Sequence, residues 1–343
     1  MREVTGSSPV SSTKFGQKHL ISGRISLFLE LFRELGFQRI RFDHIFDHRQ
    51  NSFGLVGTSG GLRSAGPGSE GNMIKKLYPQ GKPKAFVVTY DDGVLQDRPF
   101  VALLNRYGLK GTFNWNFGLM ENEFEWTHEN GSVIKRLSTQ SAAALYQGHE
   151  IASHSLTHPY MEHLSEEELM AELLTDKANL ERLFGREIKG FAVPFDYYSG
   201  LIEHCARRCG FAYVRLPKES HSFLPPEDTF NWTAGIFHLD RSLTDFVDAF
   251  LSASDELAFC QIAGHSYDLD TENMWGVMED IFKKVSVGRD ILPMTTVELI
   301  EYLRAMRGAE ITGRHIRNNS DISLWFQIDG DICEIGAGQG IDL

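Results

Sequence analysis

The amino-acid sequence predicts an α/β protein built on a parallel sheet, because strand patterns alternate with helix patterns from residue 82 onward. The run 86–90 is apolar and rich in valine and aromatic residues, which is typical of a strand buried on both faces. It stops at Asp91, Asp92 and Gly93, and the amphipathic segment 98–104 follows. The two aspartates are therefore expected at the carboxyl end of a central strand, where ligands and catalytic groups gather in α/β proteins.

The same alternation continues along the chain and supplies helix signals that can be tested. Ser165 followed by Glu168 predicts a capping box, and Gly185 predicts the end of that helix. Ser138 is expected to cap a short helix through residue 146. The other expected helices are 201–209 and 296–307, and the other expected strands are 110–116, 150–153, 191–194, 211–215 and 257–263.

The last part of the chain breaks this alternation. Two strand patterns, 323–328 and 331–335, flank Asp329 and Gly330, which predicts a β-hairpin with a two-residue turn. A hairpin of this size does not fold alone, so it is expected to pack on the main domain. Trp325 is interpreted as a packing residue, although a carbohydrate-binding role is open.

The first part of the chain also differs in composition. Residues 1–14 are rich in Ser, Pro and Thr and residues 54–71 in Gly and Ser, which is typical of disordered or linker segments. The opening residues resemble translation begun wrongly inside a tRNA gene, and Met73 is a candidate for the true start. The hydrophobic stretch 25–35 has internal charges and no small-residue cleavage site, so no signal peptide is evident and a cytoplasmic location is favoured.

The charge and the cysteines exclude several classes of partner and of fold. The net charge of the 343 residues is −12 and basic residues form no block, so neither nucleic acid nor a membrane surface is an expected partner. The four cysteines form no Cys-x-x-Cys pair, and Cys205 and Cys209 lie in an expected helix. They are interpreted as packing thiols rather than a disulfide framework.

Two histidines indicate a metal site near the aspartates. His154 and His158 are four residues apart, which places both imidazoles on one side of a helical turn, and Pro159 stops that helix. Two neutral imidazoles and one carboxylate can bind a divalent cation with coordination positions left open. Neighbouring residues of a regular strand point to opposite sides, so Asp91 and Asp92 are expected to have different tasks unless the strand breaks. Alone, the Asp-Asp-Gly sequence would also suit a solvated turn.

Four stretches carry a resemblance to a known family. The stretches 89–93 (TYDDG), 148–159 (GHEIASHSLTHP), 190–195 (GFAVPF) and 264–268 (GHSYD) resemble, in order, motifs of the polysaccharide deacetylases, the NodB-homology domain of carbohydrate esterase family 4. The resemblance implies a distorted, incomplete parallel (β/α) barrel of about seven strands. The expected domains are a disordered or non-native extension (1–72), a NodB-like deacetylase barrel (73–308) and a C-terminal β appendage (309–343).

The resemblance also implies roles for individual residues. Asp92, His154 and His158 match the family's metal ligands, with Zn²⁺ as the expected divalent ion. Asp91 matches the general base that takes a proton from metal-bound water as this water attacks the acetyl carbonyl. His265 matches the general acid that protonates the leaving group.

The sequence departs from the family pattern at one position with chemical consequences. Ala192 stands two residues before Pro194, where the family usually carries an arginine that orients the base. Either another cation replaces this arginine, with Arg215 and Lys218 as candidates, or catalysis is weaker. Asp228, in a partly recognisable fourth motif, is given no role.

The predicted function is a metal-dependent hydrolase that removes acetyl groups from a polysaccharide or oligosaccharide, with N-acetylglucosamine units as the expected substrate. Two alternatives are open: a hydrolase of cyclic amides on the same fold, and a non-catalytic carbohydrate-binding relative. His149 is expected to support the site or the fold rather than to bind metal. Aromatic residues could line a sugar groove or belong to the core: Trp115, Tyr197, Tyr198, Trp232 and Tyr267. The sequence does not assign the oligomeric state.

Overall fold

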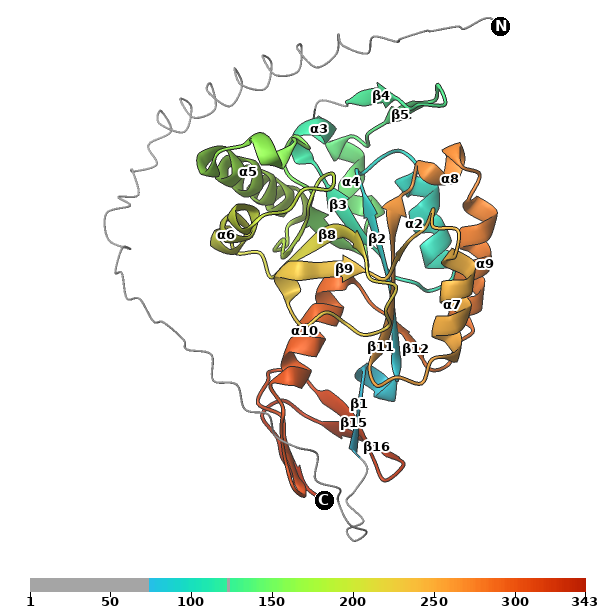
Figure 1. Cartoon of the computed structure of the whole chain (residues 1–343), viewed down its shortest axis with the longest axis vertical. Helices are drawn as coiled ribbons and strands as arrows, with labels where there is room; N and C mark the ends of the chain where they lie inside the picture. Colours follow the sequence, from blue (N-terminus) through green and yellow to red (C-terminus); the bar gives the residue numbers. More distant parts are fainter. Residues whose placement is uncertain (1–73, 122–123) are drawn as a thin grey trace, which may run out of the picture. The chain divides into compact units, whose positions relative to one another are not determined.

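The structure is a computed structural model that describes residues 74–121 and 124–343 (Figure 1). The predictions for residues 1–72 and for Met73 lie outside the described residues.

The central sheet confirms the predicted fold class. All of its nine strands are parallel, in the order β10-β11-β2-β3-β6-β7-β8-β9, with β12 also paired to β2. The strands are β2 (Lys84–Asp91), β3 (Thr112–Trp115), β6 (Glu150–Ser153), β7 (Gly190–Ala192), β8 (Tyr213–Glu219), β9 (Trp232–Ala234), β10 (Ile236–Phe237), β11 (Ala258–His265) and β12 (Ile291–Pro293).

A single bent segment nearly closes this sheet into a barrel. β9 pairs with β8, and after Gly235 the chain continues as β10, which pairs with β11. The Gly235 N–H donates to the Gln261 carbonyl over 2.9 Å, and a Cβ at Gly235 would lie 3.1 Å from the same oxygen. The strand count exceeds the predicted seven because the short strands β10 and β12 have no pattern of their own in the sequence.

Alternate residues of β2 face two different environments. Phe86, Val88 and Tyr90 belong to the core between the sheet and the helices, whereas Val87 packs in a second cluster with Phe259. This alternation follows from the period of a strand. The surrounding helices are α2 (Asp97–Arg106), α3 (Phe117–Glu121), α4 (Thr139–Leu145), α5 (Glu166–Phe184), α6 (Gly200–Arg208), α7 (Leu243–Ser252), α8 (Asp268–Thr271), α9 (Trp275–Ser286) and α10 (Thr296–Arg307).

The helix signals are confirmed in α5 and not in α4. Ser165 and Glu168 form the reciprocal capping box, and Gly185 ends α5 with a φ of 64°. Ser138 occupies the N-cap position of α4, but its side chain caps no backbone N–H and lies 3.2 Å from the Ser141 hydroxyl. The prediction that the Ser138 side chain caps the helix was therefore wrong, because the neighbouring hydroxyl competes for its oxygen.

The predicted C-terminal hairpin is present and is part of a larger sheet. Asp329 and Gly330 form its turn with positive φ values of 51° and 102°. Its first strand pairs with the strand that begins the described chain, so the start of the described chain and the C-terminal hairpin form one antiparallel sheet. The strands outside the barrel are β1 (Ile74–Leu77), β4 (Glu125–Thr127), β5 (Val133–Lys135), β13 (Glu310–Thr312), β14 (His315–Arg317), β15 (Leu324–Ile328), β16 (Asp331–Ile335) and β17 (Gly340–Asp342).

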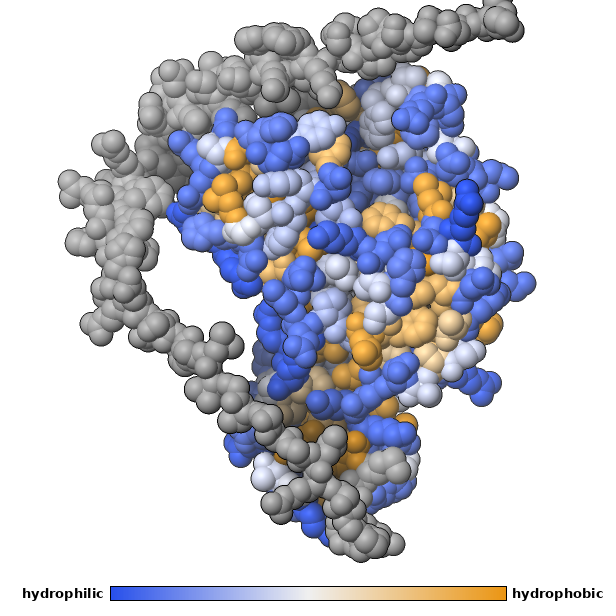
Figure 2. Space-filling model, in the orientation of Figure 1, coloured by the Kyte–Doolittle hydropathy of each residue, from blue (hydrophilic) through white to orange (hydrophobic). Residues whose placement is uncertain are grey.

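On the face shown in Figure 2, hydrophilic residues of the described chain alternate with apolar patches. Within residues 74–121 and 124–343, no helix combines the length and the apolar character that crossing a membrane requires.

Candidate metal centre and active site

β2 brings both aspartates to its carboxyl end, where the strand breaks. Asp92 adopts a φ of 80°, and the regular alternation of side chains ends there. Asp91 Oδ2 lies 4.0 Å from His154 Nε2, and Asp92 Oδ1 lies 3.8 Å from His158 Nε2. Both carboxylates therefore reach the histidines, which a regular strand would not allow.

The histidines lie on a loop after β6 and not on a helical turn. Ser155 and His158 have positive φ values of 66° and 52°, so the prediction of a helical turn was wrong. The loop nevertheless brings the rings of His154 and His158 together, with centroids 4.8 Å apart. Backbone and side-chain hydrogen bonds from neighbouring elements impose this conformation.

Two buried carboxylates of α5 hold this loop. Asp176 accepts hydrogen bonds from Ser153 Oγ (2.6 Å) and from the Phe117 N–H (2.7 Å). Glu172 accepts from the backbone N–H and the hydroxyl of Thr157, over 2.9 and 2.7 Å. Because both acids are almost fully buried, these bonds fix the start and the end of the histidine loop. In the sequence, acids one turn apart on a helix look like an exposed face, so they give no signal.

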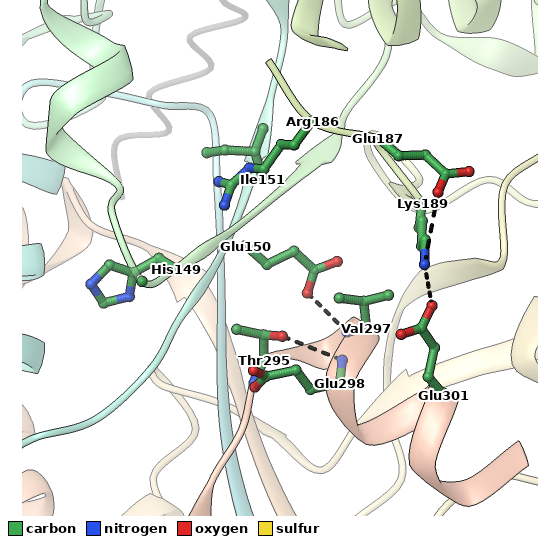
Figure 3. Close-up of a pocket in the computed structure, with 11 residues that line it drawn as sticks. His149, Glu150, Ile151, Arg186, Glu187, Lys189, Thr295, Val297, Glu298 and Glu301 are labelled. Carbon is green, nitrogen blue, oxygen red and sulfur yellow. Dashed lines mark hydrogen bonds and ion pairs between the residues drawn. The ribbon is translucent and has the colours of Figure 1, made fainter. Parts of the chain in front are cut away.

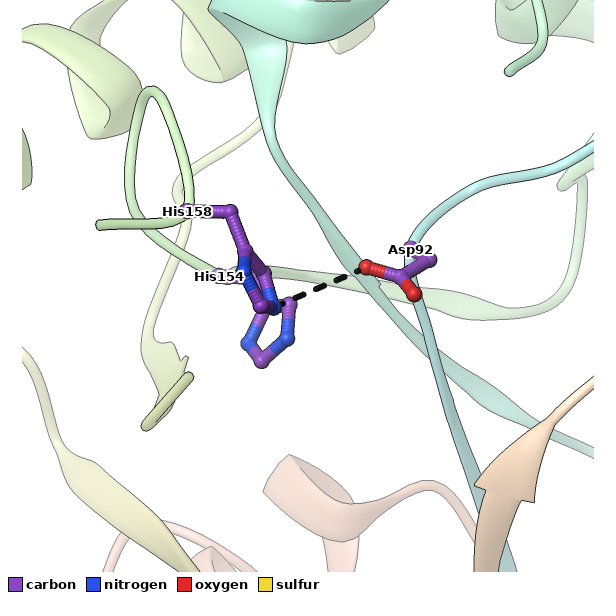
Figure 4. A group of neighbouring side chains, drawn as sticks. All are labelled: Asp92, His154 and His158. Carbon is purple, nitrogen blue, oxygen red and sulfur yellow. Dashed lines mark ion pairs between the residues drawn. The ribbon is translucent and has the colours of Figure 1, made fainter. Parts of the chain in front are cut away.

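Asp92, His154 and His158 form a donor set that fits a divalent cation. Their ligand atoms lie within 4.8 Å of one another (Figure 4). His154 Nδ1 lies 2.8 Å from the Ala192 carbonyl, which leaves Nε2 facing the carboxylates. Burial lowers the pKa of His154, and lowers the pKa of His158 to about 3, so both imidazoles are neutral at neutral pH. One carboxylate and two neutral imidazoles are typical donors for zinc and similar ions.

An arginine that the sequence analysis missed contacts one of these donors. Arg136, which follows β5, is buried and places Nη2 3.1 Å from Asp92 Oδ1. Its Nη1 donates to Asn116 Oδ1 over 2.7 Å and also to the Asp92 carbonyl. Burial alone would raise the pKa of Asp92, but Arg136 and His158 keep it well below its usual value. No motif marks Arg136 in the sequence.

Arg215 supplies the positive charge that the family usually carries at the position of Ala192. Ala192 of β7 and Arg215 of β8 are directly paired, so their side chains leave neighbouring strands at the same height in the sheet. Arg215 Nη2 lies 2.5 Å from Asp91 Oδ2, and Asn114 Nδ2 donates to Asp91 Oδ1 over 2.7 Å. Although burial would raise the pKa of Asp91, Arg215 lowers it. Lys218, the other candidate, is exposed.

His265 belongs to a chain of hydrogen bonds at the end of β11. Its Nδ1 lies 3.0 Å from Asp268 Oδ2, which also lies 3.1 Å from His238 Nε2. His238 Nδ1 lies 2.6 Å from the Tyr90 hydroxyl, and a Cβ at Gly264 would overlap the His238 ring at 2.4 Å. Burial would lower the pKa of His265, but Asp268 and the nearby aspartates raise it to about 9. His265 is therefore protonated at neutral pH and can donate a proton.

The aromatic residues expected in a sugar groove divide into two groups. Trp115 and Trp232 are fully buried, so of the two alternatives left open by the sequence the core is the one that holds for them. Tyr198 is half-buried and donates to the Phe230 carbonyl over 2.6 Å. Tyr197 is exposed, and Tyr267 stacks on the His265 ring with centroids 5.0 Å apart.

His149 lies at the opposite end of the sheet from the aspartates. Its Nδ1 accepts from the Gly111 N–H over 3.0 Å, and its Nε2 lies 3.1 Å from Asn105 Oδ1. It borders a cavity of about 320 Å³ that also involves Glu150 and Arg186 (Figure 3). These contacts confirm that His149 supports the fold rather than the metal centre.

The comparisons with known proteins agree with the motifs. Residues 79–214 match the family model described as polysaccharide deacetylase. No curated protein matches the chain. Solved structures that resemble it include a Streptococcus pyogenes deacetylase, PplD, in complex with acetate, at 21% identity over 38% of this chain and 55% of that chain, with a TM-score of 0.34.

Two further solved structures cover a larger share of this chain. The Xyl-CE4 domain of a multidomain xylanase from the hindgut metagenome of Trinervitermes trinervoides is 18% identical over 65% of this chain and 92% of that chain, with a TM-score of 0.43. A putative polysaccharide deacetylase from Mycobacterium smegmatis is 15% identical over 68% and 94% of the two chains, with a TM-score of 0.47. The family match over residues 79–214 confirms the resemblance to the polysaccharide deacetylases and supports a deacetylase-like hydrolase.

Proposed function

We propose that the chain removes acetyl groups from a polysaccharide or oligosaccharide, with N-acetylglucosamine units as substrate, in a reaction that requires a divalent cation. The observation that carries the proposal is the convergence of three kinds of group at the carboxyl end of the barrel. These are an ionised carboxylate, a metal-type donor set and a protonated histidine. A site that only binds sugar needs no such combination.

Each residue has a separate task in this proposal. Asp91, oriented by Arg215 and Asn114, accepts a proton from the attacking water. His265, oriented by Asp268, donates a proton to the nitrogen or oxygen that leaves the acetyl carbon. The carbon–nitrogen or carbon–oxygen bond breaks, and acetate and a free amine or hydroxyl group are the products.

The metal donors complete the site. When bound by Asp92, His154 and His158, a divalent cation such as Zn²⁺ supplies a Lewis acid that polarises the acetyl carbonyl and acidifies water. Asp176 and Glu172 keep the two histidines in place through the loop contacts described above. Arg136 orients the Asp92 carboxylate from the side of β5.

The cyclic-amide alternative loses its main support. It was open because no arginine accompanied Asp91 in the third motif, but Arg215 supplies that charge from the neighbouring strand. A carboxylate held in its ionised form is what a general base for deacetylation requires.

Acetate release tests the proposal directly. N-acetylglucosamine oligomers and acetylated xylan are incubated with the parent protein, with Asp91→Asn and with His154→Ala, each with and without a chelator. The parent is expected to release acetate and to stop with chelator, and both variants are expected to be inactive. The control is Glu310→Gln, an exposed residue of β13 that should keep full activity. No release from any acetylated sugar by the metal-loaded parent would contradict the proposal.

A further inference from the structure

A second group of metal-type donors lies outside the metal centre, where the sheet closes. It consists of Glu219, His221 and Asp240, and its three donor atoms lie within 4.8 Å of one another, as do those of the metal centre. His221 Nε2 is 3.0 Å from Glu219 Oε2 and 3.9 Å from Asp240 Oδ2. Donors about 2.0–2.2 Å from one ion are about 3.3 Å from each other in a tetrahedral site. We call these three side chains the closure cluster.

The closure cluster joins two segments that flank the bend at Gly235. Glu219 ends β8 and His221 follows it, whereas Asp240 follows β10 and precedes α7. The His221 N–H donates to the Gly235 carbonyl over 2.9 Å. The pairing of β8 with β9 is irregular between Leu216 and Glu219, and such a bulge changes the direction of a side chain. An ion bound by the cluster would therefore link β8 to the segment that follows the bend.

Each carboxylate of the closure cluster is held by its other oxygen. Glu219 Oε1 accepts from the Phe237 N–H over 2.6 Å. Asp240 Oδ1 accepts from the N–H and the hydroxyl of Ser242, over 2.7 and 2.6 Å. Carboxylates that bind metal ions are hydrogen-bonded in this manner, because such contacts fix the direction of the ligand atom. The bonds from Ser242 also hold the pKa of Asp240 below its usual value, so this carboxylate is ionised at neutral pH.

A surface ion pair accounts for only part of this arrangement. It would need His221 and one carboxylate, whereas here two carboxylates converge on the same imidazole nitrogen. In the part of the chain that the structure describes, no lysine or arginine forms an ion pair with Glu219 or Asp240. Two like charges at this distance repel each other, and a divalent cation between them removes the repulsion. His221 also has a φ of 47°, a conformation that costs free energy in a residue other than glycine.

We propose that Glu219, His221 and Asp240 bind a second divalent cation, separate from the one in the metal centre. Imidazole suits zinc and carboxylate oxygens suit manganese, so the mixed donor set fits an ion of this kind. The three side chains are 23%, 48% and 28% exposed, so water competes with the ion for them. The site therefore fills only at cation concentrations far above those that saturate the buried metal centre.

A cation in the closure cluster would steady the acid side of the active site. The segment 237–240 begins at the N–H that Glu219 accepts and ends at the ligand Asp240. Within it, His238 Nε2 lies 3.1 Å from Asp268 Oδ2, the carboxylate that orients the candidate acid. Holding both ends of this segment holds His238 against Asp268. This consequence rests on the proposed function, but the cation site itself does not.

Zinc content tests the site without any measurement of activity. The metal-free full chain is dialysed against increasing zinc concentrations, and bound zinc is measured by atomic absorption. The parent is expected to bind two zinc ions per chain at saturation, in two separate steps, and His221→Ala and Glu219→Gln are expected to bind one. The control is His204→Ala, which removes an exposed histidine 3.7 Å from Glu166 Oε1 and should keep both ions. Glu219→Gln preserves the shape of the side chain, so it separates loss of a ligand from loss of folding.

The number of imidazole ligands shows which site holds the ion. The double variant Asp92→Asn, His154→Ala disables the metal centre, so its zinc at high concentration should show one imidazole in X-ray absorption. The zinc of His221→Ala should show two, because only the metal centre is left. Amide hydrogen exchange of the segment 237–240 should slow in the double variant as zinc rises, and should not change in His221→Ala.

The outcomes for the cation site and for the chemistry are distinct. A single zinc ion per chain in the parent, or a second ion that persists in both His221→Ala and Asp240→Asn, would overturn the inference even if acetate is released, and would leave an ordinary ion pair only. Two ions, one of them lost in these variants, without acetate release from any substrate would support the cation site and contradict the proposed function.

Discussion

Replacement of Arg215 by methionine tests the buried ion pair between Arg215 and Asp91. Arg215 and Asp91 are 1% and 6% exposed, and their charged atoms are 2.5 Å apart. Met keeps an unbranched stem like that of Arg but has no guanidinium, so the substitution leaves the Asp91 carboxylate buried without its cation. Breaking a buried pair in this way costs about 3–5 kcal/mol. Urea denaturation of Arg215→Met should show a loss of this size, and Lys218→Met, at an exposed position, should show almost none.

The same substitution should change how activity depends on pH. Arg215 lowers the pKa of Asp91, so its removal raises that pKa. A general base must be ionised, and the acidic limb of kcat/KM should therefore move to higher pH in Arg215→Met. Arg215→Lys keeps a charge and should move the limb less. An unchanged profile in a folded Arg215→Met protein would refute the role that we assign to this arginine.

The register of the sheet allows a rescue experiment. Ala192 and Arg215 are paired residues of neighbouring strands, so an arginine at position 192 approaches Asp91 from the adjacent strand. We expect the double variant Ala192→Arg, Arg215→Ala to recover part of the activity and of the acidic limb lost in Arg215→Ala. Recovery would show that the charge near Asp91 matters rather than the strand that carries it.

Three other predictions concern the metal centre and the buried acids. Zinc at about 100 times its Kd at the metal centre should stabilise the parent and Asp91→Asn against thermal denaturation by about 2.7 kcal/mol. It should not stabilise Asp92→Asn, which lacks one ligand. If zinc failed to stabilise Asp91→Asn, the assigned ligands would be contradicted. Asp176→Ala leaves two buried donors without an acceptor, which should lower the free energy of unfolding by about 1–3 kcal/mol per donor. The same variant should bind zinc more weakly in a calorimetric titration. Glu167→Gln, on the exposed face of the same helix, is the control and should change neither. Burial raises the pKa of Asp97 from 3.8 to about 7, so as pH rises the unfolded chain loses this proton before the folded chain does. Between pH 3.8 and about pH 7, the free energy of unfolding should therefore fall by about 1.4 kcal/mol per pH unit. Asp97→Asn should flatten that part of the stability curve in urea denaturation, and an unchanged slope would refute the shift.

The parts of the fold that were predicted correctly depend on local signals. The start and end of α5 follow from Ser165, Glu168 and Gly185, whose contacts lie within a few residues of each helix end. The hairpin follows from Asp329 and Gly330 in the same way. Strand closure around Gly235 has no such signal, because it depends on pairing with two distant strands.

The candidate site was predictable only where its residues occur in contiguous motifs. The conformation of the histidine loop was not predicted because Ser155 has a positive φ, and serine is not a residue type that favours a positive φ. The partners of the aspartates are separated from them by 44 residues for Arg136 and by 124 residues for Arg215. Contacts at such distances along the chain depend on the completed fold, so a sequence pattern can suggest candidates but cannot choose among them.

The two arginines indicate how adjacent carboxylates can coexist in this barrel. Asp91 and Asp92 repel each other, and each is almost fully buried, so each needs its own positive partner. Arg215 serves Asp91, and Arg136 serves Asp92. Arg215, His265 and Asp268 lie beyond the family match, which ends at residue 214, and they reach the site because β8 and β11 belong to the same sheet as β2. In this chain, the position of a positive charge in space therefore decides whether the Asp91 carboxylate is held ionised, and the absence of an arginine from one motif does not.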